Sequence, residues 1–306
     1  MSSGTRLDAE EKEDEKDFFN ETFRTSLLDI LNYSEREFRP KLFHYTDANG
    51  LKGILKSQSL WLTDNLFLND SNEIFHGLDI AKEILSEKEN DNTLDKSARE
   101  FAAFLRDNLS RHIRVFTPMT VSFCEDPDLL SQWHGYGKGK IGYSIGFDTN
   151  FLINEDNVMI FKVLYNAEQQ KSILEKVIHR AMQEFQRSKI SLEDINENLF
   201  IYRKLFMAFY CLALAFKDPN FEIEQEWRAA KLTIPGYDNI QTRISNDILI
   251  PFYEHYMSDV EKAIQHIIVG PSNNANLAFL GVAYLLNEMN LKNVGVYSSR
   301  IPYRRD

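Results

Sequence analysis

A charged segment at residues 222–228 constrains the fold most, because it runs directly into a predicted strand. It reads Glu-Ile-Glu-Gln-Glu-Trp-Arg, and the apolar run 229–234 after it predicts a strand that ends at a Pro-Gly turn. If the second half of the segment is extended, alternation puts Glu224, Glu226 and Arg228 on one face. Burying unpaired charges costs several kcal/mol, so this face lies either on a solvated sheet edge or in a cleft.

The composition indicates a globular chain without a general attraction for nucleic acids or membranes. Its 306 residues are 43% hydrophobic and 12% aromatic, which is enough for a sizeable core. The net charge of −11 provides no basic field for nucleic acid or an anionic membrane surface. The apolar run 205–216 is too short to span a bilayer, and Cys124 and Cys211 lie far apart in apolar surroundings. We therefore expect a soluble, cytoplasmic protein with no membrane partner.

Helical and strand patterns are mixed along the chain. Spacing of apolar residues predicts helices at 18–33, after Asp47, at 74–116 with a polar interruption at 87–95, and at 168–187, 193–216, 245–265 and 273–289. Strands are predicted at 41–46, 60–63, 119–124, 141–147, 158–165, 229–234, 267–270 and 294–297, with loops at 69–73 and 130–137. Scattered strands favour an α+β fold over a doubly wound parallel sheet. We expect an acidic, disordered start at 1–17 and one domain at 18–306, with helical insertions at about 74–116 and 168–216.

Several common chemistries find no support in the sequence. No glycine-rich phosphate loop opens a helix, and the glycines at 135–142 match neither the Walker nor the dinucleotide spacing. The seven histidines show no metal-ligand spacing, so no metal is expected. Cys124 lies in a predicted strand, where a lone thiol is more often part of the core than a nucleophile.

The remaining polar and aromatic residues suggest a nucleotide site. His44 ends a predicted strand, a loop carries Ser131, Gln132, Trp133 and Tyr136, and Glu224 precedes Glu226 by two residues. Together they offer a group that hydrogen-bonds a ribose, aromatic faces for a flat ring, and two carboxylates. Two carboxylates so close repel one another, which favours a proton on one of them. Such a pair suits the stabilisation of a sugar oxocarbenium ion. Each residue also has a structural interpretation when it is taken singly. His44 is as well explained as a buried core histidine, and Trp133 could simply cap the sheet.

A set of ordered blocks resembles a widespread, poorly characterised bacterial family. That family is grouped with the ADP-ribosyltransferase superfamily and is often linked to phage defence. The blocks lie at 43–46, 60–64, 69–73, 122–123, 130–133, 145–147, 224–228 and 299–304. The resemblance implies a split, bent pair of small sheets that hold NAD in a cleft.

The resemblance also implies roles for individual residues. His44 would bind the adenosine ribose, Glu226 would bind the nicotinamide ribose and support the cationic transition state, and Glu224 would position or deprotonate the acceptor. The helix after His44 would present its N-terminus to the pyrophosphate. Ser122, Trp133, Tyr136 and Tyr143 are alternatives for holding the nicotinamide. The full set of expected NAD-binding residues is His44, Tyr45, Thr46, Ser122, Gln132, Trp133, Tyr136 and Arg228.

Three functions remain open at this level. The first is an NAD-dependent mono-ADP-ribosyltransferase that acts as a toxin or defence effector on a protein or nucleic acid. The second is a non-catalytic sensor or interaction module that binds NAD or a related nucleotide, and the third is an NAD glycohydrolase. NAD would be a substrate in the first and third, without a metal. The helices at 168–216 would recognise the acceptor or dock an antitoxin or partner subunit.

Overall fold

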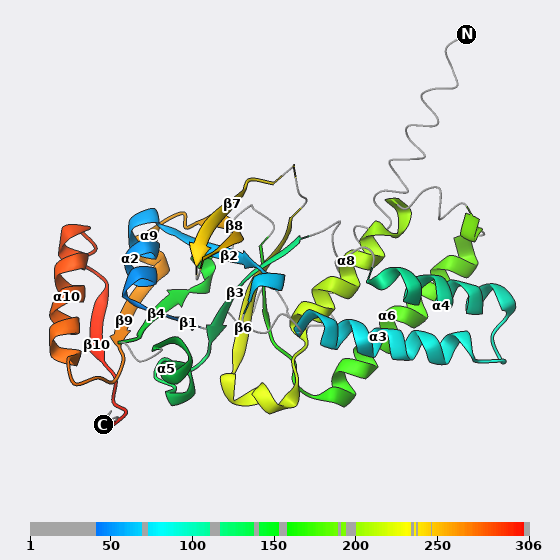
Figure 1. Ribbon diagram of the computed structural model, residues 1–306, viewed down its shortest axis with the longest axis horizontal. Coiled ribbons are helices and arrows are strands. Elements are labelled where there is room, and N and C mark those ends of the chain that lie inside the picture. The colour runs from blue at the N-terminus through cyan, green and yellow to red at the C-terminus, as the bar shows by residue number, and fades with distance from the viewer. Residues whose placement is uncertain are drawn as a thin grey trace, which may run out of the picture. The chain divides into compact units, whose positions relative to one another are not determined.

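A computed structural model describes most of the chain beyond residue 40 (Figure 1). The described residues are 41–68, 73–110, 117–137, 141–152, 158–188, 191–193, 200–233, 236, 238–245 and 247–302. The expected disordered start at 1–17, the helix at 18–33 and most of the loop at 69–73 lie outside them. The chain divides into two compact units, of which one is helical and the other is built on a sheet.

The described residues of the helical unit form four long helices with a common apolar core. They are α3 (Glu73–Glu89), α4 (Lys96–Leu109), α6 (Ala167–Ser188) and α8 (Phe200–Ala215). The side chain of Asp95 caps α4 by accepting a hydrogen bond from the Ala98 amide, as its position before an apolar stripe favours. Phe101 of α4 stacks on Phe185 of α6 with ring centroids 4.1 Å apart. Helices are therefore observed within the regions 74–116 and 168–216 that the apolar spacing predicts to be helical, whereas residues 111–116, 189–190 and 194–199 of these regions lie outside the described residues.

In the sheet unit, the described residues form ten strands in one hydrogen-bonded sheet. The strands are β1 (Lys41–Thr46), β2 (Ser59–Asp64), β3 (Thr117–Cys124), β4 (Tyr143–Asp148), β5 (Met159–Lys162), β6 (Glu226–Thr233), β7 (Ile240–Ser245), β8 (Ile248–Tyr256), β9 (Ile264–Val269) and β10 (Gly295–Ser298). Their main order is β10-β9-β4-β1-β3-β2-β8-β7, with β6 paired to β3 and β5 to β6. All pairs are antiparallel except β9 with β10. The expected α+β class is confirmed at this level.

The sheet branches at β3. Along one edge β3 pairs with β6 over its full length, from Thr117 to Cys124. On the other edge β2 pairs with its beginning, at Met119 and Thr120, whereas β1 pairs only at Cys124. Strands β1 and β2 therefore diverge opposite the stretch of β3 that contains Ser122. This divergence leaves a main-chain group of β3 to be satisfied by something other than a neighbouring strand.

Helices cover both faces of the strands around β1. Helix α2 (Ala48–Ser57) contacts β1, β2 and β4, and the short α9 (Val260–Ala263) contacts β4 and β9. Helix α5 (Leu130–Gly137) packs against β1 on the other face, where Trp133 joins a core cluster with Phe43 and Tyr45. Helix α10 (Ala275–Glu288) joins the parallel strands β9 and β10 and lies beside them in Figure 1.

Two local predictions are wrong. The region 245–265 was predicted to be helical, but Ile248–Tyr256 forms strand β8 between β2 and β7. Apolar residues at both helical and strand spacing made this segment ambiguous, and its hairpin with β7 together with its long-range pairing to β2 decides for a strand. The loop predicted at 130–137 is helix α5, and Trp133 of this helix buries its ring in the cluster with Phe43 and Tyr45.

Candidate functional site

The acidic stretch bends before the strand begins. Asp218 caps the short 3₁₀ helix η4 (Pro219–Glu224), in which the proline occupies the first turn. Gln225 then adopts a left-handed backbone conformation with φ 46°, and β6 starts at Glu226. Glu224 consequently lies on η4 and does not share a strand face with Glu226. The prediction that Glu224, Glu226 and Arg228 line one strand face holds only for the last two.

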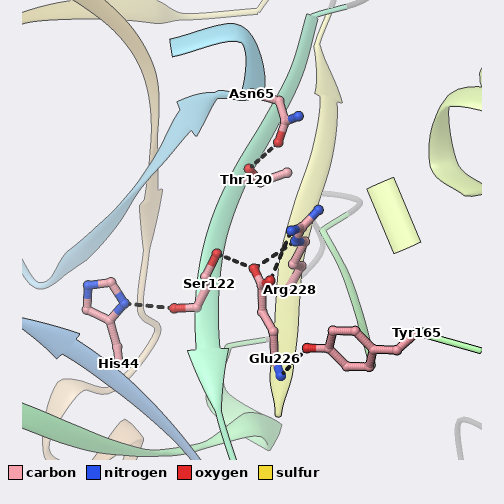
Figure 2. A network of polar contacts seen from close by, with 7 residues as sticks. All are labelled: His44, Asn65, Thr120, Ser122, Tyr165, Glu226 and Arg228. Atoms are coloured by element: carbon pink, nitrogen blue, oxygen red, sulfur yellow. Dashed lines mark hydrogen bonds and ion pairs between the residues drawn. The ribbon is translucent and has the colours of Figure 1, made fainter. Parts of the chain in front are cut away.

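Glu226 lies in a buried ion pair with Arg228 (Figure 2). Arg228 Nε donates to Oε1 at 2.8 Å and an η nitrogen of Arg228 donates to Oε2 at 3.0 Å. The residues are only 5% and 1% exposed, respectively. Ser122 Oγ donates a third hydrogen bond to Oε1 at 2.6 Å, and Tyr165 Oη accepts from the Glu226 amide at 3.0 Å. The bidentate geometry offsets the cost of removing both charges from water and fixes the carboxylate in one orientation.

His44 joins this network through the main chain of β3. Its Nδ1 lies 2.9 Å from Ser122 O, at the stretch where β1 and β2 diverge (Figure 2). Because a carbonyl oxygen can only accept, Nδ1 carries the proton. Burial lowers the pKa of His44, and the hydrogen bond to Ser122 opposes that shift only in part. The ring is thus a neutral imidazole with a fixed tautomer near neutral pH.

Register places His44 and Glu226 on opposite faces of the sheet. Phe43 is directly opposite Cys124, and Cys124 is opposite Glu226, so these three side chains share a face. His44 follows Phe43 and projects to the other face, where its ring contacts Phe123 edge-on. Ser122 connects them with its carbonyl oxygen toward His44 and its hydroxyl toward Glu226. His44 and Glu226 are therefore linked through Ser122, but their side chains do not face a common groove.

A second buried polar contact lies on the same strand, β3, next to the network of His44, Ser122 and Glu226. Thr120, two residues before Ser122, donates from Oγ1 to Asn65 Oδ1 at 3.2 Å (Figure 2). Asn65 is fully buried, and its Nδ2 has no hydrogen-bond partner among the residues that the structure describes. Neither Asn65 nor Thr120 was predicted from the sequence. Each residue lies in a short apolar run whose local sequence predicts only a strand or a turn. The pairing of β2 with β3 brings the two side chains together.

Tyr45 and Trp133 form a structural corner. Tyr45 Oη donates to Asp126 O at 2.8 Å and accepts from the Leu129 amide at 2.9 Å, and burial raises the pKa of its phenol. The Trp133 ring packs edge-on against Tyr45 at 4.7 Å, and Trp133 Nε1 donates to Asp128 Oδ1 at 2.8 Å. Both rings belong to the core cluster, which favours the interpretation of Trp133 as a cap on the sheet.

The remaining residues that were expected to bind NAD lie on β1, α5 and β4. Thr46 and Gln132 are half-buried at the end of β1 and in α5, and Tyr143 is buried at the start of β4. The side chain of Tyr136 lies outside the described residues. The N-terminus of α2, expected to face a pyrophosphate, is capped by Asp47, whose Oδ1 accepts from the Gly50 amide at 2.9 Å. A carboxylate therefore already occupies the anion position at that helix end.

The part of the chain that the structure describes contains no group of three or more His, Cys, Asp or Glu side chains placed to hold a metal ion. Within the same residues, no helix is long and apolar enough to cross a membrane.

Fold and site together define a class: a mixed α+β protein with a mostly antiparallel sheet that branches at β3 and carries a buried Glu-Arg pair beside the branch. The model of one family, described as a protein of unknown function (DUF2971), matches residues 132–229. The matched segment runs from Gln132 in α5 to Ala229 in β6 and so includes Glu226 and Arg228. No curated protein and no solved structure matches the chain.

Proposed function

We propose that the protein is an NAD-dependent mono-ADP-ribosyltransferase that acts as a toxin or phage-defence effector on a macromolecular acceptor. One observation carries the proposal: Ser122 joins His44 of β1 and Glu226 of β6 in a single hydrogen-bonded network. These are residues of three of the blocks by which the sequence resembles the ADP-ribosyltransferase superfamily. The divergence of β1 and β2 from β3 supports the split sheet that the resemblance implies.

In this proposal Glu226 provides the fixed negative charge of the reaction. Departure of nicotinamide from the ribose C1′ leaves positive charge on an oxocarbenium ion, which an oriented carboxylate stabilises. Ser122 and Arg228 hold that carboxylate in one orientation before the substrate arrives. Glu224, half-buried on η4 just before β6, would take the proton of the acceptor as the acceptor attacks C1′.

Arg228 also sets a requirement on this mechanism. Its guanidinium contacts both oxygens of Glu226, and its positive charge reduces the field that the carboxylate exerts on a developing cation. Catalysis therefore requires that a ribose hydroxyl displace at least one of these two contacts.

The buried ion pair favours a second function, a non-catalytic module that binds NAD or a related nucleotide. A carboxylate that remains paired with Arg228 on both oxygens is a structural element of the sheet and does not act on a substrate. Binding of a nucleotide would then depend on the residues around β1 and α5. The two functions differ in what Glu226 contributes, which makes them separable by mutation.

Incubation with NAD labelled in the adenylate half and a bacterial lysate tests the proposal. Wild type is expected to transfer label to a macromolecule. The folded fraction of Glu226→Gln is expected to lose transfer by at least about 100-fold while it still binds NAD, since the loss of a transition-state interaction affects turnover rather than affinity. Glu224→Gln is the matched control, with a smaller loss confined to the acceptor step. Free ADP-ribose alone indicates an NAD glycohydrolase. Binding of NAD without any product, unaffected by Glu226→Gln, establishes the sensor and refutes the transferase.

A further inference from the structure

Helix α10 turns an apolar face to the solvent at one end of the sheet unit (Figure 1). The helix contacts β9 and β10, and its residues Val282 and Leu286 are buried. Leu277, Leu280 and Tyr284, in contrast, are 70%, 53% and 76% exposed. Their spacing of three and four residues places them along one line on the side of the helix away from the sheet. A helix that is apolar on all sides is normally covered on all sides, so this outer face of α10 is suited to a further contact.

The outer face of α10 lies in an uncharged segment. Residues 270–287 contain no Asp, Glu, Lys or Arg, although these four types make up 26% of the chain. A partner recognised by its charge, such as a nucleic acid or a basic protein, has nothing to pair with here. Two copies of a chain with a net charge of −11 repel one another in general, and an uncharged face is where this repulsion is weakest.

Another group of exposed apolar residues lacks this property. Ile244, Ile248 and Leu249 lie at the turn between β7 and β8, and Arg243 and Asp247 stand among them in the sequence. Across a two-fold axis, each of these charged residues would face a like charge of the second copy. The outer face of α10 is therefore the better candidate for a contact between identical chains.

A glycine in the middle of α10 points to a close approach by another helix. Glycine destabilises a helix interior relative to alanine, so its presence at position 281 calls for a reason. A Cβ atom built at Gly281 would meet nothing within 4 Å in this chain, so the folded chain has no steric need for glycine there. The absence of a side chain allows a second helix to cross close to α10, since the distance between two helix axes depends on the side chains at the crossing.

The positions of these residues are self-complementary. Leu277 precedes Gly281 by four residues, and Tyr284 follows it by three. If two copies of α10 cross antiparallel near Gly281 about a two-fold axis, Leu277 of each copy meets Tyr284 of the other, and Leu280 lies beside the axis. The rows 277–281 and 280–284 are ridges of residues four apart, which interdigitate in the commonest class of helix packing. A two-fold interface requires such a match of one surface to itself.

The exposed area sets the strength of this contact. Full burial removes about 150–250 Å² of an aromatic side chain from water and roughly 60–120 Å² of a leucine. At the observed exposures, Leu277, Leu280 and Tyr284 therefore contribute roughly 200–350 Å² per copy. Twice this area is below the roughly 1,200 Å² at which interfaces of standard size begin. The contact is thus that of a weak dimer whose formation depends on concentration.

We propose that the outer face of α10 is the contact surface of a weak homodimer, in which two copies of α10 cross antiparallel at Gly281. The dimer does not depend on the function proposed for the network at Glu226, because α10 contributes no residue to that network.

Sedimentation of the intact chain between about 2 and 200 µM tests the proposal. The mass of wild type is expected to rise from one chain toward two, with a Kd between about 10 and 100 µM. Tyr284→Glu places like charges in the contact and is expected to raise this Kd by at least about tenfold. Ile244→Glu is the matched control, because Ile244 is also 76% exposed and receives the same charge. Its Kd is expected to stay within about twofold of that of wild type.

Gly281→Arg separates the contact from the stability of the helix. Arginine is a better helix former than glycine and has open space at this position, so the thermal midpoint is expected to be at least that of wild type. The substitution also lowers the net negative charge, yet the side chain holds the two helices apart, and the Kd is expected to rise by at least about tenfold. Leu280→Cys, beside the axis, is expected to form a disulfide between copies at least about tenfold faster than Ile244→Cys in oxidised glutathione, since Cys124 and Cys211 are buried.

The proposal is overturned if wild type remains a monomer at about 200 µM. It is also overturned if Tyr284→Glu and Gly281→Arg associate as tightly as wild type, or if Ile244→Glu alone weakens the dimer, which would place the contact at the β7–β8 turn.

Discussion

Removal of one partner from the Glu226–Arg228 pair is expected to destabilise the sheet unit strongly. Arg228→Leu leaves a carboxylate buried without its guanidinium, and such an uncompensated charge costs about 3–5 kcal/mol. With a urea dependence of about 2 kcal/mol per M for a domain of this size, the unfolding midpoint falls by roughly 2 M. Replacing both residues with leucine removes both charges, so stability returns to within about 1 kcal/mol of wild type.

Tryptophan fluorescence is a suitable assay because all three tryptophans, Trp61, Trp133 and Trp227, belong to the sheet unit. The signal therefore reports this unit without a contribution from the helical one. A double-mutant cycle of the two leucine substitutions isolates the coupling energy of the pair, which we expect to exceed about 2 kcal/mol.

Lys262→Gln is the matched control. It removes the exposed ion pair between Lys262 and Asp259 and is expected to cost less than about 1 kcal/mol. If Arg228→Leu costs no more than this control, the buried pair does not hold the start of β6. The account of the network as a fixed, preorganised carboxylate is then wrong.

Two further predictions concern residues around this network. Burial raises the pKa of Cys124 to about 11, so at pH 8 only about one molecule in a thousand carries the thiolate, and iodoacetamide should label it over 100-fold more slowly in the native than in the unfolded chain. The rate should rise about tenfold per pH unit below pH 11, and fast labelling of native Cys211→Ser at pH 8, read by mass spectrometry, would contradict this burial. Asp128→Ala removes the acceptor of three hydrogen bonds, from Trp133, Ser299 and Arg300, and is expected to accelerate tryptic cleavage after Arg300 by at least about tenfold. Cleavage at the wild-type rate, followed by the mass of the released tail, would show that Asp128 does not hold the tail.

Local sequence patterns determined much of the secondary structure. The helix after Asp47 was predictable because a residue with a carboxylate precedes apolar residues at helical spacing. The strands at 41–46 and 119–124 were predictable from β-branched and aromatic runs. These signals depend on neighbours within a few residues, so one sequence suffices to read them. The segment 245–265 lacked a decisive period, and its strand depends on pairing with β2, some 190 residues away.

The candidate site was predicted in part. Glu226, Ser122 and His44 were all singled out from the sequence, and the structure places them in one network. Which way each side chain faces was not predictable, because the face of a strand residue follows from its register with neighbours that are distant in the chain. The left-handed Gln225 shifted that register by separating Glu224 from the strand.

The sequence by itself determined most of the helices and strands and which residues are able to carry charge or form hydrogen bonds, since charge, hydrogen-bonding capacity and local periodicity belong to the residues. Only the tertiary structure decided that Glu226 is buried against Arg228, that His44 lies on the opposite face, and that α10 leaves an apolar face exposed. Burial and proximity arise from packing segments that the chain does not place next to one another, and no local pattern encodes them.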